Sequence, residues 1–251
     1  MSKIVLITGG SRGLGKNMAL HLAEKGRDII LTYRSGKEEA EAVVEAIRSM
    51  GRSAVALQLD VNDSANFPRF TAQVSEVLGE HWGRANFDYL INNAGSGVFK
   101  DYQDITGEEF DRMVNEHAKA PFFLTQKLLP VMKEGGRILN VSSGLTRFAL
   151  PGFSAYAMMK AAVETLSVYM AKELGSRGIS VNTLAPGAIE TDFGGGYVRD
   201  TPEVNEYVAS MTALGRVGQP EDVGGAVAAI LDDDAGWINA QRIEVSGGQA
   251  I

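Results

Sequence analysis

The chain contains no cysteine, and this absence excludes several kinds of chemistry. Without thiols there are no disulfides, no thiolate metal ligands and no cysteine nucleophile. Histidine is also scarce, since only His21, His81 and His117 occur and they are scattered along the sequence. This scatter suggests neither a metal centre nor a serine–histidine triad. We therefore expect no metal site.

Positive charge is in short supply as well. The sequence has 24 Lys and Arg against 31 Asp and Glu, a formal net charge of -7. Nucleic-acid binding depends on clusters of Lys and Arg, so this balance argues against it. No apolar stretch approaches a membrane span, and the N-terminal run Met1–Ile7 is too short and wrongly flanked for a signal peptide. We expect a cytoplasmic protein that binds neither nucleic acid nor membrane.

Short apolar runs of strand length alternate with longer helical patterns along nearly all of the chain. A strand is expected at Lys3–Thr8, followed by a helix at Leu14–Lys25 that Gly26 ends. The longest helical pattern covers about Ser154–Ser176. The other expected strands are Asp28–Arg34, Ser53–Asp60, Phe87–Asn93, Arg137–Ser142, Ile179–Ala185 and Arg242–Val245. The alternation predicts one α/β domain over residues 1–251, a Rossmann-type doubly wound fold with a parallel sheet of about seven strands and helices on both faces.

A glycine-rich turn lies between the first expected strand and its helix. The glycines allow a tight turn in which backbone N–H groups approach a pyrophosphate, whose charge the helix N-terminus favours. The residues expected to bind a dinucleotide here are Gly9, Ser11, Arg12, Gly13, Leu14 and Gly15. A nucleotide-triphosphatase loop is the rival interpretation, because Lys16 follows Gly15. Asn17, however, stands where a Ser or Thr should hold magnesium.

The spacing Thr-Gly-x-x-x-Gly-x-Gly resembles that of the short-chain dehydrogenases/reductases, and the resemblance extends over essentially the whole chain. Further matching motifs are Asp60-Val61, Asn92-Asn93-Ala94-Gly95, Asn115, Ser143, Tyr156 with Lys160, Pro186-Gly187, Thr191 and Gly215–Val223. So many motifs in one order leave little room for chance. The sequence is similar to NADPH-dependent carbonyl reductases and to 3-oxoacyl-carrier-protein reductases.

The cofactor preference follows from the end of the second expected strand. Folds that prefer NAD place an acid there, about 20 residues past the glycines, for the ribose 2′-hydroxyl. The corresponding residues are Tyr33, Arg34 and Ser35, and none of them is acidic. Arg34 and Arg12 could instead converge on a 2′-phosphate, which predicts NADPH/NADP. The alternative is that both arginines are solvated surface charges.

Other cofactor contacts are implied by the resemblance alone. Asp60 and Val61 would border the adenine, and Ile189 and Thr191 would face the nicotinamide carboxamide. The remaining residues implied to line the cofactor are Asn92, Ala94, Gly95, Tyr156, Lys160, Pro186 and Gly187. Asn92 could equally be a structural residue at the end of a strand.

The chemistry expected of the site is carbonyl reduction. Tyr156 and Lys160 are four residues apart, so they share one face of the long helix. We expect Tyr156 to be the proton donor and Lys160 to lower the pKa of its phenol. By resemblance, Ser143 would donate to the substrate oxygen and Asn115 would anchor a water that links Lys160 to solvent. Each of these residues also has an ordinary structural explanation, and a non-catalytic NADPH-binding sensor is the remote alternative.

The substrate is only broadly indicated. Ser143, Phe153, Tyr156 and Phe193 are expected to contact a ketone or aldehyde in a mostly apolar pocket. A role as a 3-oxoacyl-carrier-protein reductase is the alternative, in which Arg177 would dock the acidic carrier. The resemblance also implies a homotetramer, with the helix that bears Tyr156 at one interface and the last strand at another. Its apolar residues Val163, Leu166, Val168 and Met170 fit a helix that is covered on more than one side.

Overall fold

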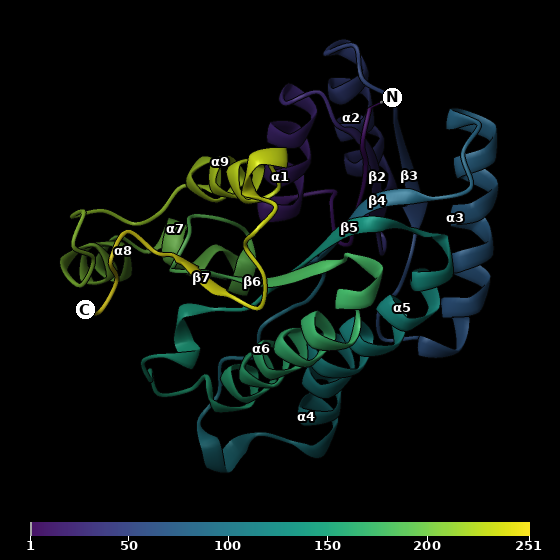
Figure 1. Cartoon of the computed structure of the whole chain (residues 1–251). Coiled ribbons are helices and arrows are strands. Elements are labelled where there is room, and N and C mark those ends of the chain that lie inside the picture. Colours follow the sequence, from purple (N-terminus) through teal and green to yellow (C-terminus); the bar gives the residue numbers. More distant parts are fainter. Residues whose placement is uncertain (1) are drawn as a thin grey trace.

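The computed structural model describes residues 2–251, within which seven parallel strands form one sheet in the order β3-β2-β1-β4-β5-β6-β7 (Figure 1). This confirms the predicted fold class. The strands are β1 (Ile4–Ile7), β2 (Asp28–Tyr33), β3 (Ala54–Gln58), β4 (Phe87–Asn92), β5 (Met132–Val141), β6 (Ser180–Pro186) and β7 (Arg242–Val245). Strands β1 and β4 are buried along their whole length because both faces of the sheet are covered.

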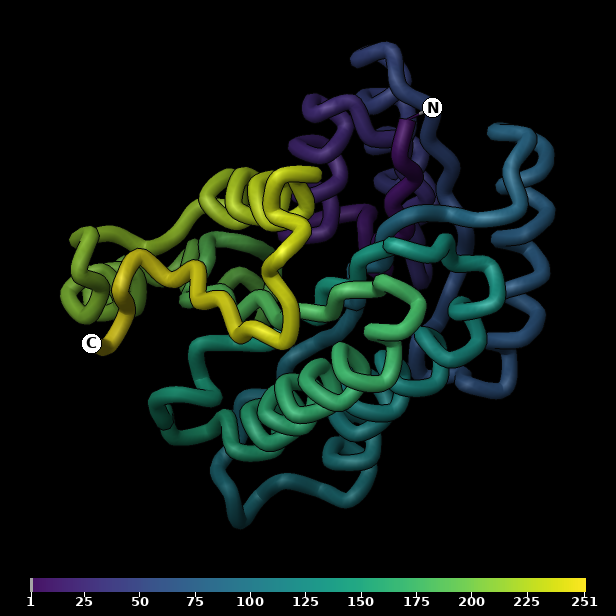
Figure 2. The backbone as a smooth tube through the Cα atoms, in the orientation of Figure 1, coloured from purple at the N-terminus to yellow at the C-terminus, as the bar shows by residue number. Residues whose placement is uncertain are grey.

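Helices cover both faces of the sheet (Figures 1 and 2). One face carries α1 (Gly13–Glu24), α2 (Lys37–Ser49) and α9 (Pro220–Ile230). The other carries α3 (Phe67–Trp82), α5 (Ala120–Leu128) and α6 (Ser154–Glu173). Strand β1 shows the alternation that this requires. Its Val5 and Ile7 pack in the first core and its Ile4 and Leu6 in the second.

The remaining helical segments are shorter. Helix α4 (Gly107–Val114) continues into α5 through a π-helical turn, η3 (Asn115–Lys119). Helix α8 (Pro202–Ser210) lies away from the sheet, beside the C-terminus, and the short helix α7 (Tyr197–Asp200) precedes it (Figure 1). The 3-10 turns are η1 (Ser64–Asn66), η2 (Tyr102–Asp104), η4 (Leu129–Val131), η5 (Gly144–Thr146), η6 (Gly175–Arg177), η7 (Phe193–Gly196) and η8 (Asp233–Ala235).

Two predicted boundaries were wrong. Strand β5 begins at Met132, five residues before the predicted Arg137, because its pairing with β4 shifts register between Phe87 and Tyr89. The exposed residues at this irregularity interrupt the apolar pattern, so the sequence did not indicate a strand there. Helix α6 ends at Glu173 and gives way to η6, after which Gly178 adopts a left-handed conformation with φ of 66°. The apolar periodicity alone did not mark this earlier end.

The strand order places a crevice at one edge of the sheet. Strand β1 lies between β2 and β4, and the strand order runs outward from it in both directions, through β2 to β3 and through β4 to β7. Ligands of such sheets bind at the carboxyl ends of the strands where the order reverses. The glycine turn follows β1, Asn93 follows β4, Ser143 lies just past β5 and Gly187 follows β6. Within residues 2–251, no helix has the length and apolar character that a bilayer crossing requires.

Candidate active site

The glycine turn is packed too tightly for larger residues. A Cβ on Gly15 would lie 2.1 Å from the carbonyl oxygen of Gly9, and Gly9 itself has φ of 68°. The side-chain amide of Asn93 donates to the carbonyl oxygens of Thr8 (2.9 Å) and Gly9 (3.1 Å) and holds the turn in place. The sequence analysis named Asn93 as part of the Asn92-Asn93-Ala94-Gly95 motif and missed this role.

The N-terminus of α1 is open to an anion. Arg12 occupies the cap position with an extended backbone, makes no capping bond with its side chain, and no acidic residue lies in the first turn. The first N–H groups of the helix and its positive end therefore face the crevice uncompensated. Leu14 belongs to this first turn, and Ser11 precedes it.

The predicted 2′-phosphate site lies where the glycine turn meets the end of β2. The backbone N–H of Gly10 donates to the carbonyl of Thr32 (2.8 Å), so the two segments are adjacent. Tyr33 ends β2, and Arg34 and Ser35 follow it on the surface. Neither Arg12 nor Arg34 forms an ion pair with a carboxylate of residues 2–251. Both guanidinium groups are thus available to a phosphate.

The expected adenine edge lies past β3. The Asp60 carboxylate accepts hydrogen bonds from the backbone N–H and the side-chain amide of Asn62, at 2.9 and 3.1 Å. These bonds fix the turn at Asp60 and Val61. Val61 is half-buried and packs against the core on the α3 side of the sheet.

The side chain of Asn92 has a structural role. Its amide is buried and donates to the hydroxyl of Thr125 (3.0 Å) and to the side-chain oxygen of Asn140 (2.8 Å). Of the two interpretations that the sequence left open, the structure favours the structural one. Ala94 donates its N–H to the Thr8 hydroxyl, and Gly95 comes next at the crevice.

The segment after β6 crosses back toward the glycine turn. A Cβ on Gly187 would lie 2.8 Å from the side-chain oxygen of Gln249, which also accepts a hydrogen bond from the N–H of Ala188. Thr191 is buried, and a Cβ on Gly13 would lie 3.9 Å from the Thr191 Cβ. Pro186 ends β6, and Ile189 pairs with Gly218. The sequence analysis missed Gln249, for which no motif gave a signal.

Ser143, Tyr156 and Lys160 come together beside this crevice. The Lys160 Nζ lies 5.4 Å from the centre of the Tyr156 ring and donates to the carbonyl oxygen of Val141 at 2.8 Å. Ser143 lies close enough to Tyr156 for its side chain to lower the pKa of the phenol. The neighbouring Ser142 hydroxyl instead donates a hydrogen bond to the Glu164 carboxylate at 2.6 Å. The structure thus brings Ser143, and not Ser142, to the tyrosine.

Burial governs the acidity of both groups on α6. It raises the pKa of Tyr156 above its ordinary value, and the nearby Ser143 side chain only partly opposes this. It lowers the pKa of Lys160 to about 8, against the opposing charge of Glu116. The net direction for Tyr156 is upward because loss of hydration dominates, and the expected influence of the Lys160 cation on this phenol stays a prediction. The phenol stays protonated at neutral pH, which is the form that a proton donor needs.

Asn115 lies on a turn that packs against α6, and within residues 2–251 no hydrogen bond joins its side chain to the other predicted catalytic residues. It begins η3, is half-buried, and its side chain makes no hydrogen bond to a group of residues 2–251. Two residues later, the His117 ring lies edge-on to Tyr156, with ring centres 5.1 Å apart. The sequence analysis noted His117 only as one of three scattered histidines. Its position two residues after Asn115 was the available signal.

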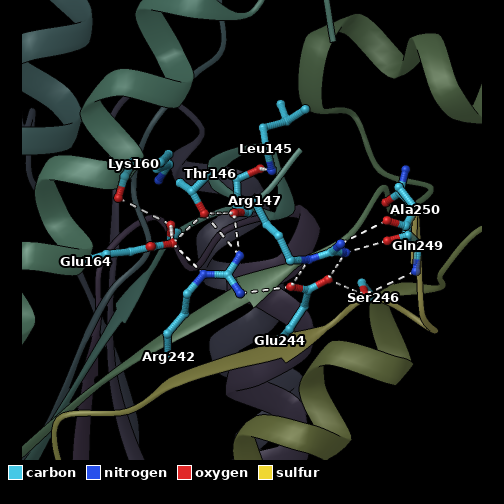
Figure 3. Close-up of polar contacts among 12 residues, drawn as sticks. Leu145, Thr146, Arg147, Lys160, Glu164, Arg242, Glu244, Ser246, Gln249 and Ala250 are labelled. Atoms are coloured by element: carbon cyan, nitrogen blue, oxygen red, sulfur yellow. Dashed lines mark hydrogen bonds and ion pairs between the residues drawn. The ribbon is translucent and has the colours of Figure 1, made fainter. Parts of the chain in front are cut away.

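An ionic network fixes the segment that follows Ser143 (Figure 3). The Glu164 carboxylate accepts from the Thr146 hydroxyl and from Arg242, both at 2.8 Å. Arg147 forms a two-point ion pair with Glu244 on β7, at 2.9 and 2.7 Å. These bonds join η5, α6 and β7. The Ser143 hydroxyl accepts the N–H of Leu145 at 3.3 Å, so its own proton stays available for donation.

Aromatic side chains surround the entrance above Tyr156. The centres of the Phe193 and Tyr156 rings are 5.6 Å apart. The centre of the Phe99 ring lies 5.1 Å from that of Phe153 and 6.4 Å from that of Tyr197. Phe99, Phe193 and Tyr197 remain 45–66% exposed. A cavity of about 450 Å³ adjoins Phe153. It is lined by Asp101, Tyr102, Gln103, Leu145, Ala149, Leu150, Pro151, Gly152, Phe153, Ser154 and Ala157.

The nucleotide-triphosphatase alternative finds no support in this geometry. Asn17, at the position where a hydroxyl should hold magnesium, is buried and donates its amide to Glu221 at 2.9 Å. Within residues 2–251, no three His, Asp or Glu side chains gather in a way that could hold a metal ion.

Comparison with known proteins yields one consistent group of enzymes. A family model described as enoyl-(acyl carrier protein) reductase matches residues 9–250. The hydroxynaphthalene reductase-like protein Arp2 of Metarhizium brunneum is 34% identical, over 98% of this chain and 94% of the relative. Versicolorin reductase 1 of Aspergillus parasiticus is 35% identical, over 98% and 95%. The crystal structure of the angucycline C-6 ketoreductase LanV with bound NADP superposes with a TM-score of 0.93 at 37% identity, over 99% of this chain and 95% of LanV.

Proposed function

Because this chain belongs to the short-chain dehydrogenase/reductase family, we propose that it reduces the carbonyl group of a polycyclic aromatic ketone with NADPH, with Tyr156 as the proton donor. The observation that carries this proposal is the meeting of Ser143, Tyr156 and Lys160 beside the open N-terminus of α1. The site has an anion-binding end for a dinucleotide and an acid at its other end.

The chemistry requires a hydride on carbon and a proton on oxygen. NADPH, when bound, supplies the hydride. As the carbon–oxygen double bond becomes a single bond, the Ser143 hydroxyl donates a hydrogen bond to the oxygen and stabilises its growing charge. The Tyr156 hydroxyl then transfers its proton to that oxygen, which yields the alcohol. Lys160, as an ammonium group, stabilises the phenolate left on Tyr156 and supports its reprotonation.

The preference for NADPH rests on two unpaired arginines. Arg12 and Arg34 extend from adjacent segments at the ribose end of the crevice, and no acid stands at the end of β2 to bind a free 2′-hydroxyl. Guanidinium groups match phosphate oxygens in geometry and charge. LanV, the similar ketoreductase of known structure, was solved with NADP.

The substrate class rests on the aromatic entrance. Phe193 packs beside Tyr156, and Phe99 packs against Phe153 and Tyr197; ring faces of this kind suit a planar fused-ring ketone. The relatives are named as a hydroxynaphthalene reductase-like protein, a versicolorin reductase and an angucycline C-6 ketoreductase, and naphthalene is a pair of fused aromatic rings. The fatty-acid alternative is not favoured. Arg177, expected to dock an acidic carrier, is bound to Glu134 at 2.7 Å and to two backbone carbonyls.

A homotetramer built from one domain over residues 1–251 remains part of this proposal, as does a cytoplasmic location. Met158, Val168 and Tyr169 on α6 are 49–65% exposed and form an apolar outer face that suits a partner subunit. Val163, which the sequence analysis counted toward such an interface, is buried in this chain's own core. Strand β7 ends the sheet with a free edge.

The test is a turnover assay with the purified protein. NADPH is mixed with a hydroxylated naphthalenone, a β-keto ester and a β-ketoacyl thioester, and its oxidation is followed by absorbance. We expect reduction of the naphthalenone with the highest kcat/KM. Preference for the thioester would favour the fatty-acid alternative. NADPH binding without reduction of any carbonyl would favour the sensor.

A further inference from the structure

His117 is held in one protonation state by its surroundings. Its ring is 2% exposed, and its Nε2 lies 2.6 Å from the carbonyl oxygen of Ser96. Because a carbonyl oxygen can only accept, Nε2 must carry the proton. Burial, together with the nearby charge of Lys160, holds the pKa of His117 well below its ordinary value. The ring is therefore neutral, and its Nδ1 carries a free lone pair.

Ser96, which accepts the hydrogen bond from Nε2, is itself held in place by hydrogen bonds. The carboxylate of Glu116 accepts both the backbone N–H and the hydroxyl of Ser96, each at 2.6 Å. Its other oxygen accepts the side-chain amide of Asn62 at 3.1 Å. The ring also fills the space beside Gly95, where a Cβ would lie 2.3 Å from the His117 Cε1. The imidazole thus has a single orientation, set by three separate segments of the chain.

The Nδ1 of His117 is left without a partner. It is buried and makes no hydrogen bond to any group of residues 2–251. A buried acceptor without a hydrogen bond lowers stability, and native structures rarely retain one unless a ligand or water completes it. The π-helical turn η3 that carries His117 is a rare local structure that often marks functional sites.

The groups around this lone pair belong to the reaction site. Tyr156 and Lys160 of α6 lie close by, since the centre of the His117 ring and the Lys160 Nζ are 5.1 and 5.4 Å from the centre of the Tyr156 ring. Glu116 is the charged neighbour on its own turn, with an oxygen 3.9 Å from Nε2. Glu164, one turn beyond Lys160, is occupied by Ser142 and Arg242.

We propose that His117 is a positioning residue whose Nδ1 accepts a hydrogen bond from a water that also contacts Lys160. The sequence analysis gave this role to Asn115, and His117 on the same turn shares it. The inference rests on the proposed function, because the water serves to reprotonate Tyr156 after each reduction. A proton moves from the water to Lys160 as Lys160 gives one to the phenolate, and solvent restores the water. His117 stays neutral throughout and only holds the water in place.

The kinetic test compares three variants. His117→Phe keeps a ring but has no lone pair, and we expect kcat to fall about tenfold or more while KM for NADPH changes by less than about twofold. His117→Asn supplies an oxygen acceptor and should recover much of that loss. His81→Phe, on the exposed end of α3, is the matched control and should leave the rate unchanged. Asn115→Ala should lose less than His117→Phe.

The pH profile separates positioning from simple packing. Without the His117 acceptor the water stabilises the Lys160 ammonium less, so the pKa of Lys160 falls. The alkaline limb of kcat should therefore move to lower pH by about one unit in His117→Phe. Movement to higher pH would show that His117 is a cation. That result would overturn the proposal, as would unchanged kcat or a larger loss in Asn115→Ala.

A second readout does not require turnover. In the wild-type protein with bound NADP, the imidazole nitrogen resonances of His117 should report a neutral ring with the proton on Nε2 down to pH about 6, below the ordinary histidine pKa. A proton on Nδ1, or titration at the ordinary pKa, would overturn the inference even if the enzyme is active. If the wild-type protein reduces no carbonyl, the proposed function fails while this measurement still decides the state of His117.

Discussion

Replacement of Gly15 by alanine tests the dinucleotide cradle. The new Cβ would lie 2.1 Å from the carbonyl oxygen of Gly9, and ordinary contact begins at 3.4 Å, so backbone must move by about 1.3 Å. Gly9 cannot move freely, because Asn93 holds its carbonyl at 3.1 Å. Overpacking of this kind costs about 1–3 kcal/mol. Since about 1.4 kcal/mol is a factor of ten, we expect NADPH to bind about tenfold or more weakly in a fluorescence titration.

Gly79→Ala is the matched control for this experiment. Gly79 lies inside α3 with no atom within 4 Å of the added Cβ, and alanine in a helix interior stabilises by about 0.5–1 kcal/mol. We expect this variant to bind NADPH as the wild type does. If Gly15→Ala also binds NADPH with unchanged affinity, the glycine turn is not the cradle and the reasoning is refuted.

Three further predictions concern the cofactor, the proton donor and the substrate. Arg34→Asp should weaken NADPH relative to NADH by about tenfold or more, and an unchanged ratio of the two dissociation constants would argue against a 2′-phosphate contact. The rate of carbonyl reduction should fall as pH rises through about 8, since Lys160 acts as an ammonium and its pKa is lowered to about 8 by burial; a profile that stays flat through that pH would contradict this role. Phe193→Ala should raise KM for a fused-ring ketone by up to about tenfold and leave NADPH affinity unchanged, and equal KM values would remove Phe193 from the substrate site.

Much of the fold could be predicted because its signals are local. The apolar runs of β1 and β2 have no competing pattern, and Gly26 and Gly51, with φ of 80° and 76°, follow α1 and α2 as the helix ends require. The start of β5 could not be predicted. It depends on how Met132 pairs with Phe87, which lies 45 residues earlier, and not on a pattern within the strand.

The site also has features that local sequence signals could predict and features that depend on the folded structure. Tyr156 and Lys160 could be paired from their spacing on one helix, and the structure brings Ser143 to them. The raised pKa of Tyr156 could not be foreseen, because it reflects how completely the folded protein removes the phenol from water. His117 was missed for a related reason. Its contacts with Tyr156 and Ser96 arise from the π-helical turn and the crossing of separate segments.

The central claim is that Tyr156 gives its proton to the reduced carbonyl, and Tyr156→Phe tests it most directly. The variant keeps the ring that packs against His117 and Phe193 and loses only the hydroxyl. With NADPH affinity measured in parallel by fluorescence, we expect unchanged cofactor binding and a kcat for ketone reduction lowered by about a hundredfold or more. Turnover close to that of the wild type would contradict the account.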